Sequence, residues 1–298
     1  MKDTVTRRVG PAHELLRRAI GCWLPERGTQ RIPHEMAKLF PELHAGEVIA
    51  GVGANGVLFP FQRGDVAHPG YWFLYEKGVR RILKRLLKAG SIFIDVGAHR
   101  GWHSGYALSL VGPSGAVIAC EPHPGHAERL RMLAALNPDH DLRVKELAVS
   151  ANTGATTLLV SEHEGWHTII PEFEQVTDVP RRPIGIATTT LDDLFADSSD
   201  LALADRRAGV LLKIDAEGAE LEILSGARET LGLSSILGWI IECTGGPKLF
   251  AERSRSCIQI LRDAGWIPCV ITHTGTRPWR AADTESQVNI LATRKKDK

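Results

Sequence analysis

From about residue 91 to residue 293, short apolar runs alternate with segments whose apolar residues recur at helical spacing. The runs are SIFIDV (91–96), AVIACE (116–121), LRVKELAV (142–149), GVLLKID (209–215), ILGWIIEC (236–243), IPCVI (267–271) and QVNILAT (287–293). Strands that alternate with helices predict an α/β fold with a doubly wound, mostly parallel sheet. A turn-rich segment joins the last two runs, so we expect them to pair antiparallel at one edge.

Two parts of the chain stand outside this alternation. A polar, β-rich insertion separates the third run from the fourth, at about residues 151–190. The first part of the chain is rich in Gly, Pro and short apolar runs, which suggest a short helix followed by a hairpin. We therefore divide the chain into an N-terminal extension, residues 1–70, and a main domain, residues 71–298, which opens with a basic amphipathic helix near residues 73–88.

Two short motifs match known sites by spacing, but their surroundings argue against both. Residues 51–56, GVGANG, have the glycine spacing of a dinucleotide-binding loop. An apolar run ending in proline follows instead of a helix, so we expect a hairpin turn there. Residues 163–167, HEGWH, have the histidine spacing of a zinc protease, which presents both histidines from one helix. Gly165 and the following TII predict a loop or strand, so we assign no metal-ligating residues from this motif.

The segment SIFIDVGAHRGWHSG, residues 91–105, has surroundings that suit a nucleotide. A strand ends at Asp95, a glycine turn follows and a helix begins, so free backbone N–H groups can face a ligand. The next strand ends in Glu121, where a carboxylate can accept hydrogen bonds from ribose hydroxyls. The glycines are spaced G-x-x-x-G, which differs from the spacing of NAD-binding loops.

This order of features resembles the class I S-adenosylmethionine-dependent methyltransferases. Three stretches are more specifically similar to the FkbM-type methyltransferases: FIDVGAHRG (93–101), CEPHP (120–124) and LLKIDAEGAELEILSGA (211–227). The resemblance covers about residues 71 to 293 and implies a doubly wound, mostly parallel seven-stranded sheet of the Rossmann-like type, preceded by the N-terminal extension. The family usually has Asn at the position of His99.

The resemblance implies S-adenosylmethionine as the cofactor and places its contacts at the ends of the strands. Asp95 would face the ammonium group of the methionine tail, and Glu121 would bind the ribose. The backbone of the glycine turn would approach the tail so closely that a side chain would collide with it. The residues expected to bind the cofactor are Asp95, Gly97, Ala98, His99, Gly101, Glu121, Pro122, Ala148 and Asp215.

The stretch KIDAEGAE, residues 213–220, ends the fourth strand and should open on the same crevice. Two residues are candidates for the base that takes the proton from an acceptor hydroxyl, Asp215 and, in the insertion, His167. A divalent cation such as Mg²⁺, held by Asp215, Glu217 and Glu242, is an alternative that lowers the pKa of the hydroxyl, but we do not favour it.

We expect an O-methyltransferase whose acceptor is a hydroxylated small molecule, a sugar or another natural-product intermediate. The alternatives left open are an N- or C-methyltransferase with the same cofactor site, an NAD-dependent oxidoreductase and an inactive binding module. A net charge of +1 gives no reason to expect nucleic acid or an acidic membrane as partner. No apolar run has the length of a membrane span, and the scattered cysteines and the lack of a signal-peptide pattern predict a cytoplasmic protein. No feature of the sequence indicates an oligomeric state.

Overall fold

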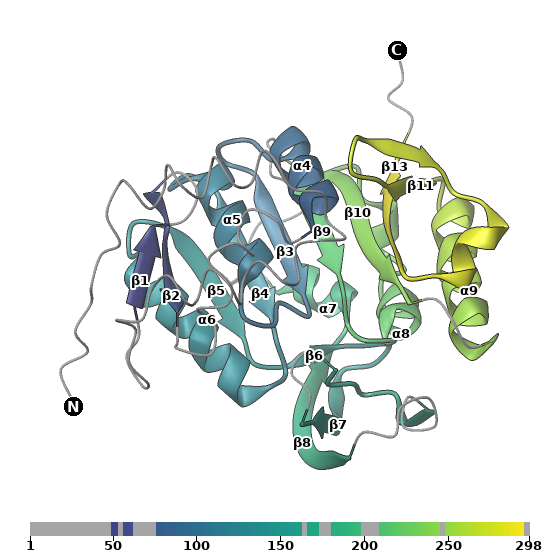
Figure 1. Cartoon of the computed structure of the whole chain (residues 1–298), viewed down its shortest axis with the longest axis horizontal. Coiled ribbons are helices and arrows are strands. Elements are labelled where there is room, and N and C mark those ends of the chain that lie inside the picture. Colours follow the sequence, from purple (N-terminus) through teal and green to yellow (C-terminus); the bar gives the residue numbers. More distant parts are fainter. Residues whose placement is uncertain are drawn as a thin grey trace, which may run out of the picture.

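The computed structural model describes residues 49–52, 56–61, 76–162, 166–172, 180–197, 209–244 and 248–294. The short helix expected near the N-terminus lies outside these residues. The described chain forms one large sheet with helices on both faces, a small second sheet and a hairpin (Figure 1). No helix among the described residues combines the length and the apolar character needed to cross a membrane.

The large sheet has eight strands in the order β12-β11-β13-β10-β9-β3-β4-β5. Their bounds are β3 (Ile92–Val96), β4 (Ala116–Cys120), β5 (Asp141–Lys145), β9 (Val210–Ile214), β10 (Ile236–Cys243), β11 (Ile267–Ile271), β12 (Thr276–Pro278) and β13 (Val288–Thr293). The neighbouring strands β5, β4, β3, β9 and β10 are all parallel to one another. Beyond β10, each neighbouring pair is antiparallel: β10 with β13, β13 with β11, and β11 with β12. Each of the seven predicted runs therefore supplies a strand of this sheet, with the expected antiparallel pair, and β12 adds a short strand at the edge.

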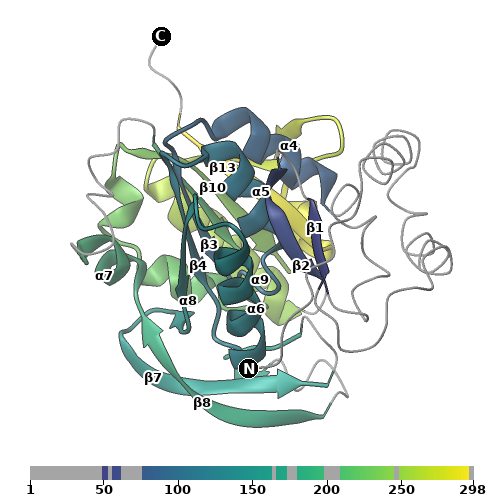
Figure 2. The same ribbon diagram turned by 90° about the vertical axis from the view of Figure 1, so that its left-hand side faces the viewer.

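The parallel strands are buried on both faces, which explains their continuous apolar sequences. Alternate residues of β3 face different cores: Ile92 and Ile94 face one, and Phe93 faces the other. The core around Phe93 is covered by α4 (Lys77–Leu86), α5 (Trp102–Val111) and α6 (Pro124–Leu136). The other core is covered by α7 (Leu191–Ala196), α8 (Glu220–Ser225) and α9 (Lys248–Asp263), as the two views show (Figures 1 and 2).

Helix α8 is shorter than the sequence pattern suggests. Apolar spacing predicts a helix from about Ala219 to Leu231, whereas α8 ends at Ser225 and a separate 3-10 turn follows. The next residue, Gly226, packs against the chain after β6, and a Cβ there would lie 2.4 Å from the backbone oxygen of Ser150. The helix ends at this close backbone contact. The contact depends on tertiary packing, so the helical spacing of apolar residues does not predict it.

The polar insertion forms a separate three-stranded sheet, in the order β6-β8-β7, below the large sheet (Figure 2). Its strands are β6 (Ala148–Val149), β7 (Gly154–Ser161) and β8 (Arg181–Thr189). The predicted strand at residues 142–149 is therefore divided, because β5 stays in the large sheet while β6 pairs with β8. A tight turn separates them, in which the N–H of Leu147 donates to the oxygen of Lys145.

The glycine motif GVGANG lies in a hairpin, as predicted. Strands β1 (Ile49–Val52) and β2 (Leu58–Phe61) pair antiparallel on either side of it. Phe59 of β2 is fully buried and its ring stacks on Trp102 at a centroid distance of 4.7 Å. The side chain of Asn137 both donates to and accepts from the backbone of the same strand. The hairpin therefore belongs to the core around α5 and α6, and the boundary near residue 70 remains a prediction.

Candidate functional site

A cavity of about 620 Å³ lies at the carboxyl ends of β3, β4 and β9. Its opposite wall includes the segment of residues 166–169, which follows β7. Thr168 attaches this segment to the loop after β9, because its hydroxyl donates to the backbone oxygen of Glu217 at 2.8 Å. Open α/β sheets bind their ligands at this edge, so the cavity is the candidate active site.

Five ionisable residues at the ends of β3, β9 and β10 line the cavity and form what we call the acidic cluster: Asp95, Lys213, Asp215, Glu217 and Glu242. Lys213 Nζ lies 2.7 Å from Asp215 Oδ2, and Lys213 is the cross-strand neighbour of Asp95. Burial alone would lower the pKa of Lys213, but the nearby carboxylates, Asp215 first, raise it above its usual value. The lysine is therefore a buried cation at neutral pH.

Asp95 is 1% exposed, and only one of its two oxygens is bonded. The hydroxyl of Ser104 donates to Oδ2 at 2.6 Å, while Oδ1 has no hydrogen-bond partner within the described part of the chain. A buried carboxylate oxygen without a donor is costly. The cavity wall thus offers an acceptor for a cationic or N–H-bearing group of a ligand.

One carboxylate oxygen from each of Asp215, Glu217 and Glu242 lies within 4.8 Å of the other two. Burial first, and then the charge of Asp215, raise the pKa of both Glu217 and Glu242 well above the usual value. Glu217 also has a left-handed backbone conformation, with φ at 47°, which is uncommon outside glycine and typical of strained functional sites. Carboxylates this close resist simultaneous ionisation, so this group can take up a proton or hold a cation.

Glu76 supports the acidic cluster from just before α4. Both of its oxygens are bonded, one to His103 Nε2 and the other to Asn289 Nδ2, each at 2.6 Å. Burial opposes ionisation, but the hydrogen bond and charge of His103 lower the pKa of Glu76 to about 2. The Glu76 carboxylate also contributes to the raised pKa of Lys213. The sequence analysis missed these contacts, because no spacing connects residues that lie so far apart along the chain.

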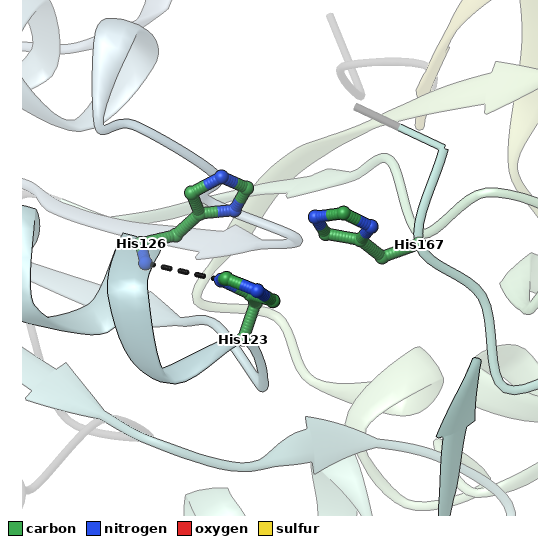
Figure 3. Close-up of side chains that lie close together, drawn as sticks. All are labelled: His123, His126 and His167. Carbon is green, nitrogen blue, oxygen red and sulfur yellow. Dashed lines mark hydrogen bonds between the residues drawn. The ribbon is translucent and has the colours of Figure 1, made fainter. Parts of the chain in front are cut away.

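Four histidines line or border another part of the same cavity, and we call them the histidine cluster: His99, His123, His126 and His167. Ring centroids lie 4.1 Å apart for His99 and His126, 4.5 Å for His126 and His123, and 4.6 Å for His123 and His167. Figure 3 shows the last three rings lying side by side. The HEGWH motif pairs His167 with His163, which lies outside the described residues, whereas the fold pairs it with α6.

Two backbone N–H groups determine which ring nitrogens carry a proton. Ser161 N–H donates to His167 Nδ1 at 3.1 Å, and His126 N–H donates to His123 Nδ1 at 3.4 Å, where it caps α6 (Figure 3). An accepting nitrogen has no proton, so in the neutral rings the proton is on Nε2. Burial first, and then neighbouring His126, lower the pKa of His167 to about 4 and also lower the pKa of His123. Both rings are therefore neutral at pH 7.

Glu121 directly follows β4 and lines the cavity, as the sequence predicts. Its Oε2 accepts the backbone N–H of His99 at 2.7 Å, and its Oε1 accepts that of His123 at 2.8 Å. Each oxygen keeps a second lone pair that can accept a ligand hydroxyl. His99 has φ at 49°, a left-handed conformation that Asn and His adopt more readily than most residues. This conformation accounts for His at a position where the FkbM-type sequences usually have Asn.

The two glycines of the turn are required by packing inside the protein. Gly97 and Gly101 have φ values of 75° and 81°. A Cβ at Gly97 would lie 1.8 Å from the backbone oxygen of Asp215, and one at Gly101 would lie 2.8 Å from the side chain of Leu130 in α6. These collisions within the fold are sufficient to require glycine at both positions, and the expected collision with the cofactor stays a prediction. Gly101 faces α6 and is not among the cavity-lining residues, so its expected cofactor contact is not supported.

The remaining predicted cofactor residues all line the cavity: Asp95, Gly97, Ala98, His99, Glu121, Pro122, Ala148 and Asp215. The two candidate bases also line it, Asp215 within the acidic cluster and His167 within the histidine cluster. The cavity therefore unites residues from four strand ends and the insertion.

Comparison with solved structures gives methyltransferases of low sequence identity. A methyltransferase FkbM from Methylobacillus flagellatus KT is 14% identical over 77% of this chain, with a TM-score of 0.42, and this chain covers 54% of its length. The O-methyltransferase TomG from Streptomyces achromogenes is 12% identical over 74% of this chain and 80% of its own, with a TM-score of 0.40. An O-methyltransferase from Bacillus cereus is 10% identical over 94% of this chain and 97% of its own, with a TM-score of 0.42.

Comparison with curated proteins gives no match. The model of the methyltransferase FkbM domain matches residues 95–267, a span that starts at Asp95 in β3 and includes the whole of β9 and β10. This span is more than half of the 298 residues. The protein therefore belongs to the FkbM methyltransferase family.

Proposed function

We propose that the protein transfers a methyl group from S-adenosylmethionine to a hydroxyl group of a sugar or another natural-product intermediate. The observation that carries the proposal is that one cavity is lined by Asp95, by Glu121 and by the carboxylates after β9 and β10. An acceptor hydroxyl must lose its proton, and the acidic cluster supplies a group that can take it. The described cysteines are free thiols, which supports a cytoplasmic location.

The cavity residues fit S-adenosylmethionine. A volume of about 620 Å³ is within the range of small-molecule sites. The unpartnered Oδ1 of Asp95 suits the ammonium group of the methionine tail, and the remaining lone pairs of Glu121 suit the ribose hydroxyls. Pro122 and Ala148 give the adenine a largely apolar surface. When bound, the cofactor supplies an electrophilic methyl group on a sulfonium centre.

We assign the proton transfer to Asp215. Lys213 Nζ lies 2.7 Å from Oδ2 of Asp215 and holds this carboxylate in place at the cavity wall. The attacking oxygen must lie in line with the bond that breaks, so the same carboxylate also orients the acceptor.

His167 is less suited to act as the base. Its Nδ1 already accepts the N–H of Ser161, and in the neutral ring Nε2 carries the proton. In this tautomer the ring donates a hydrogen bond to the cavity and does not accept a proton from it. We therefore assign His167 the role of a hydrogen-bond donor at the cavity wall, and its role as a base requires that the Ser161 contact breaks.

Thermal unfolding in the presence of ligands tests the cofactor. S-adenosylhomocysteine at about 100 times its Kd should stabilise the protein by about 2.7 kcal/mol. NAD at the same concentration should leave the unfolding temperature unchanged. Stabilisation by NAD and not by S-adenosylhomocysteine would overturn the proposal in favour of an oxidoreductase.

Mass spectrometry of the products tests the acceptor. Incubation with S-adenosylmethionine and a panel of glycosides should give O-methylated products, located by fragmentation. Methylation of nitrogen or carbon acceptors alone would replace the O-methyltransferase assignment. The same assay with EDTA tests the divalent cation, since Mg²⁺ held by Asp215, Glu217 and Glu242 would make turnover sensitive to the chelator, and the proton-transfer role of Asp215 would not.

A further inference from the structure

We propose that His123, His126 and His167 bind a divalent transition metal ion, for which zinc is the reference case. One nitrogen from each ring lies within 4.8 Å of the others. The three rings come from two segments, the start of α6 and the residues after β7, and they lie side by side (Figure 3). Zinc, nickel, cobalt and copper bind well to imidazole nitrogens, whereas magnesium and calcium prefer oxygen ligands.

The environment of His126 gives an independent reason. This side chain is buried, at 6% exposed, and its Nδ1 has no hydrogen-bond partner within the described residues. The nearest acidic atom is Oε1 of Glu121, at 3.8 Å. A buried ring nitrogen without a partner costs free energy, and a metal ion between the three rings would satisfy it.

Metal binding requires the rings to move together and to rotate. The His167 ring is stacked on the rings of His123 and His126, at interplanar angles of 23° and 24°, whereas an imidazole nitrogen binds a metal in the plane of its ring. Zinc–nitrogen bonds of about 2.0–2.1 Å in a tetrahedral site place the ligand atoms about 3.4 Å apart. The observed limit of 4.8 Å therefore has to shorten by about 1.4 Å. His167 lies in the segment between β7 and β8, outside any helix, so its side chain can make most of this movement.

Metal binding also has a cost in hydrogen bonds. Nδ1 of His123 and Nδ1 of His167 each accept a backbone N–H, and ligation through Nε2 would move the ring proton to Nδ1 and break both bonds. Three metal–nitrogen bonds would replace the two weak backbone contacts, and the site would fix the segment after β7 against α6 at the rim of the cavity.

Three protein ligands leave one coordination position open. His126 and His167 line the cavity, so this position faces the cavity or the carboxylate of Glu121. The inference does not depend on the methyl acceptor or on the base, since it concerns a second set of residues in the same cavity.

The test is a titration of the purified full chain, freed of metal by EDTA and dialysis, with zinc chloride followed by calorimetry and with cobalt chloride followed by visible absorption. We expect one zinc ion per chain and an intense cobalt band, the signature of nitrogen-rich tetrahedral coordination. His126→Ala and His167→Ala should each weaken zinc binding by at least about 100-fold. His126→Asn and His167→Gln, which keep the side-chain volume, repeat the test where an alanine variant fails to fold.

Two matched variants serve as controls. His273→Ala removes an exposed histidine outside the cluster and should leave zinc affinity unchanged. Asp215→Asn removes the central acid of the other candidate cation site and should also leave it unchanged. Three results would each overturn the inference. The first is that the wild type binds neither zinc nor cobalt, and the second is that both histidine variants still bind zinc. The third is that zinc binding is lost only in Asp215→Asn. Binding of S-adenosylhomocysteine is measured in the same samples, so that a failure of the cofactor proposal is seen separately.

Discussion

The acidic cluster and the histidine cluster occupy two walls of one cavity and differ in how charge is handled. In the acidic cluster, Lys213 is a buried cation among carboxylates, and burial raises the pKa of Glu217 and Glu242. In the histidine cluster, burial lowers the pKa of His99, His123 and His167, so the rings stay neutral. The first region is suited to moving protons or holding cations, and the second to hydrogen bonding and metal ligation. This contrast supports the proposed division in which the acidic cluster carries the proton transfer and the histidine cluster and Glu121 serve binding.

The largest expected effect comes from Gly97→Ala, which disturbs both regions at once. Gly97 lies between them, and a Cβ would collide with the backbone oxygen of Asp215 at 1.8 Å in addition to straining a φ of 75°. We expect destabilisation by about 3 kcal/mol or more, measured by urea unfolding. Gly265→Ala is the matched control, because Gly265 has the similar φ of 81° but nothing within 4 Å of the added Cβ, and it should cost only about 1–2 kcal/mol. Equal costs in the two variants would contradict the packing argument.

Asp215→Asn tests the acidic cluster alone. It keeps the volume and removes the charge and the basic oxygen, so turnover should fall by about 10²-fold or more. The affinity for S-adenosylhomocysteine should change much less, because the tail and the ribose are held by other residues. Asp263→Asn, an exposed aspartate at the end of α9, should keep full turnover. If Asp215→Asn keeps normal turnover and His167→Ala loses it, the roles that we assign to the two clusters are reversed.

Glu121→Ala tests the binding side of the cavity. The carboxylate should contribute about 1.5–3 kcal/mol to cofactor affinity, the range for hydrogen bonds to a charged group. Calorimetry with S-adenosylhomocysteine measures the loss. Glu121→Gln keeps an acceptor for the N–H of His99 or His123 and should lose less. Unchanged affinity in Glu121→Ala would remove this residue from the cofactor site.

Glu220→Gln concerns the buried loop under the acidic cluster. Burial raises the pKa of Glu220 to about 7, although its Oε1 accepts the N–H groups of Ala216 and Gly218. The folded protein therefore holds a proton that the unfolded chain releases above about 4.5, and stability contributed by this group falls as the pH rises from about 4.5 to about 7. Glutamine keeps the acceptor without a charge, so the variant should be more stable by about 1–2 kcal/mol at pH 8 and equally stable at pH 4. A wild type that gains stability relative to the variant over this range would contradict the sign.

The site residues that can be predicted from the sequence are those whose position depends only on neighbouring residues in the chain. Asp95 and Glu121 each follow an apolar run and precede a turn, so their position at a strand end can be read from neighbouring residues. The strands of the large sheet are predictable for the same reason, since apolar runs separated by helical segments specify them directly. The end of α8 was not predictable, because it depends on the contact of Gly226 with Ser150.

The residues that were missed depend on contacts between distant parts of the chain. His103 of α5 and Asn289 of β13 both bond to Glu76, which directly precedes α4. Only the tertiary fold brings these three residues together, so no spacing in the sequence predicts the contact. The motif HEGWH pairs His167 with His163 in the sequence. In the fold, the ring of His167 contacts those of His123 and His126 at the start of α6, and β5, β6 and β7 lie between these residues and His167 in the chain. Only the docking of the insertion against α6 brings these rings together.

A crystal structure of the protein with S-adenosylhomocysteine bound would test the proposed site directly. We expect the ligand in the cavity at the ends of β3, β4 and β9, with its ribose hydroxyls on the carboxylate of Glu121, its ammonium group on Oδ1 of Asp95 and its sulfur facing the side of Asp215. A ligand bound elsewhere, or one in this cavity with its adenine at the acidic cluster and its tail at the histidine cluster, would contradict the separation of chemistry and binding between the two walls.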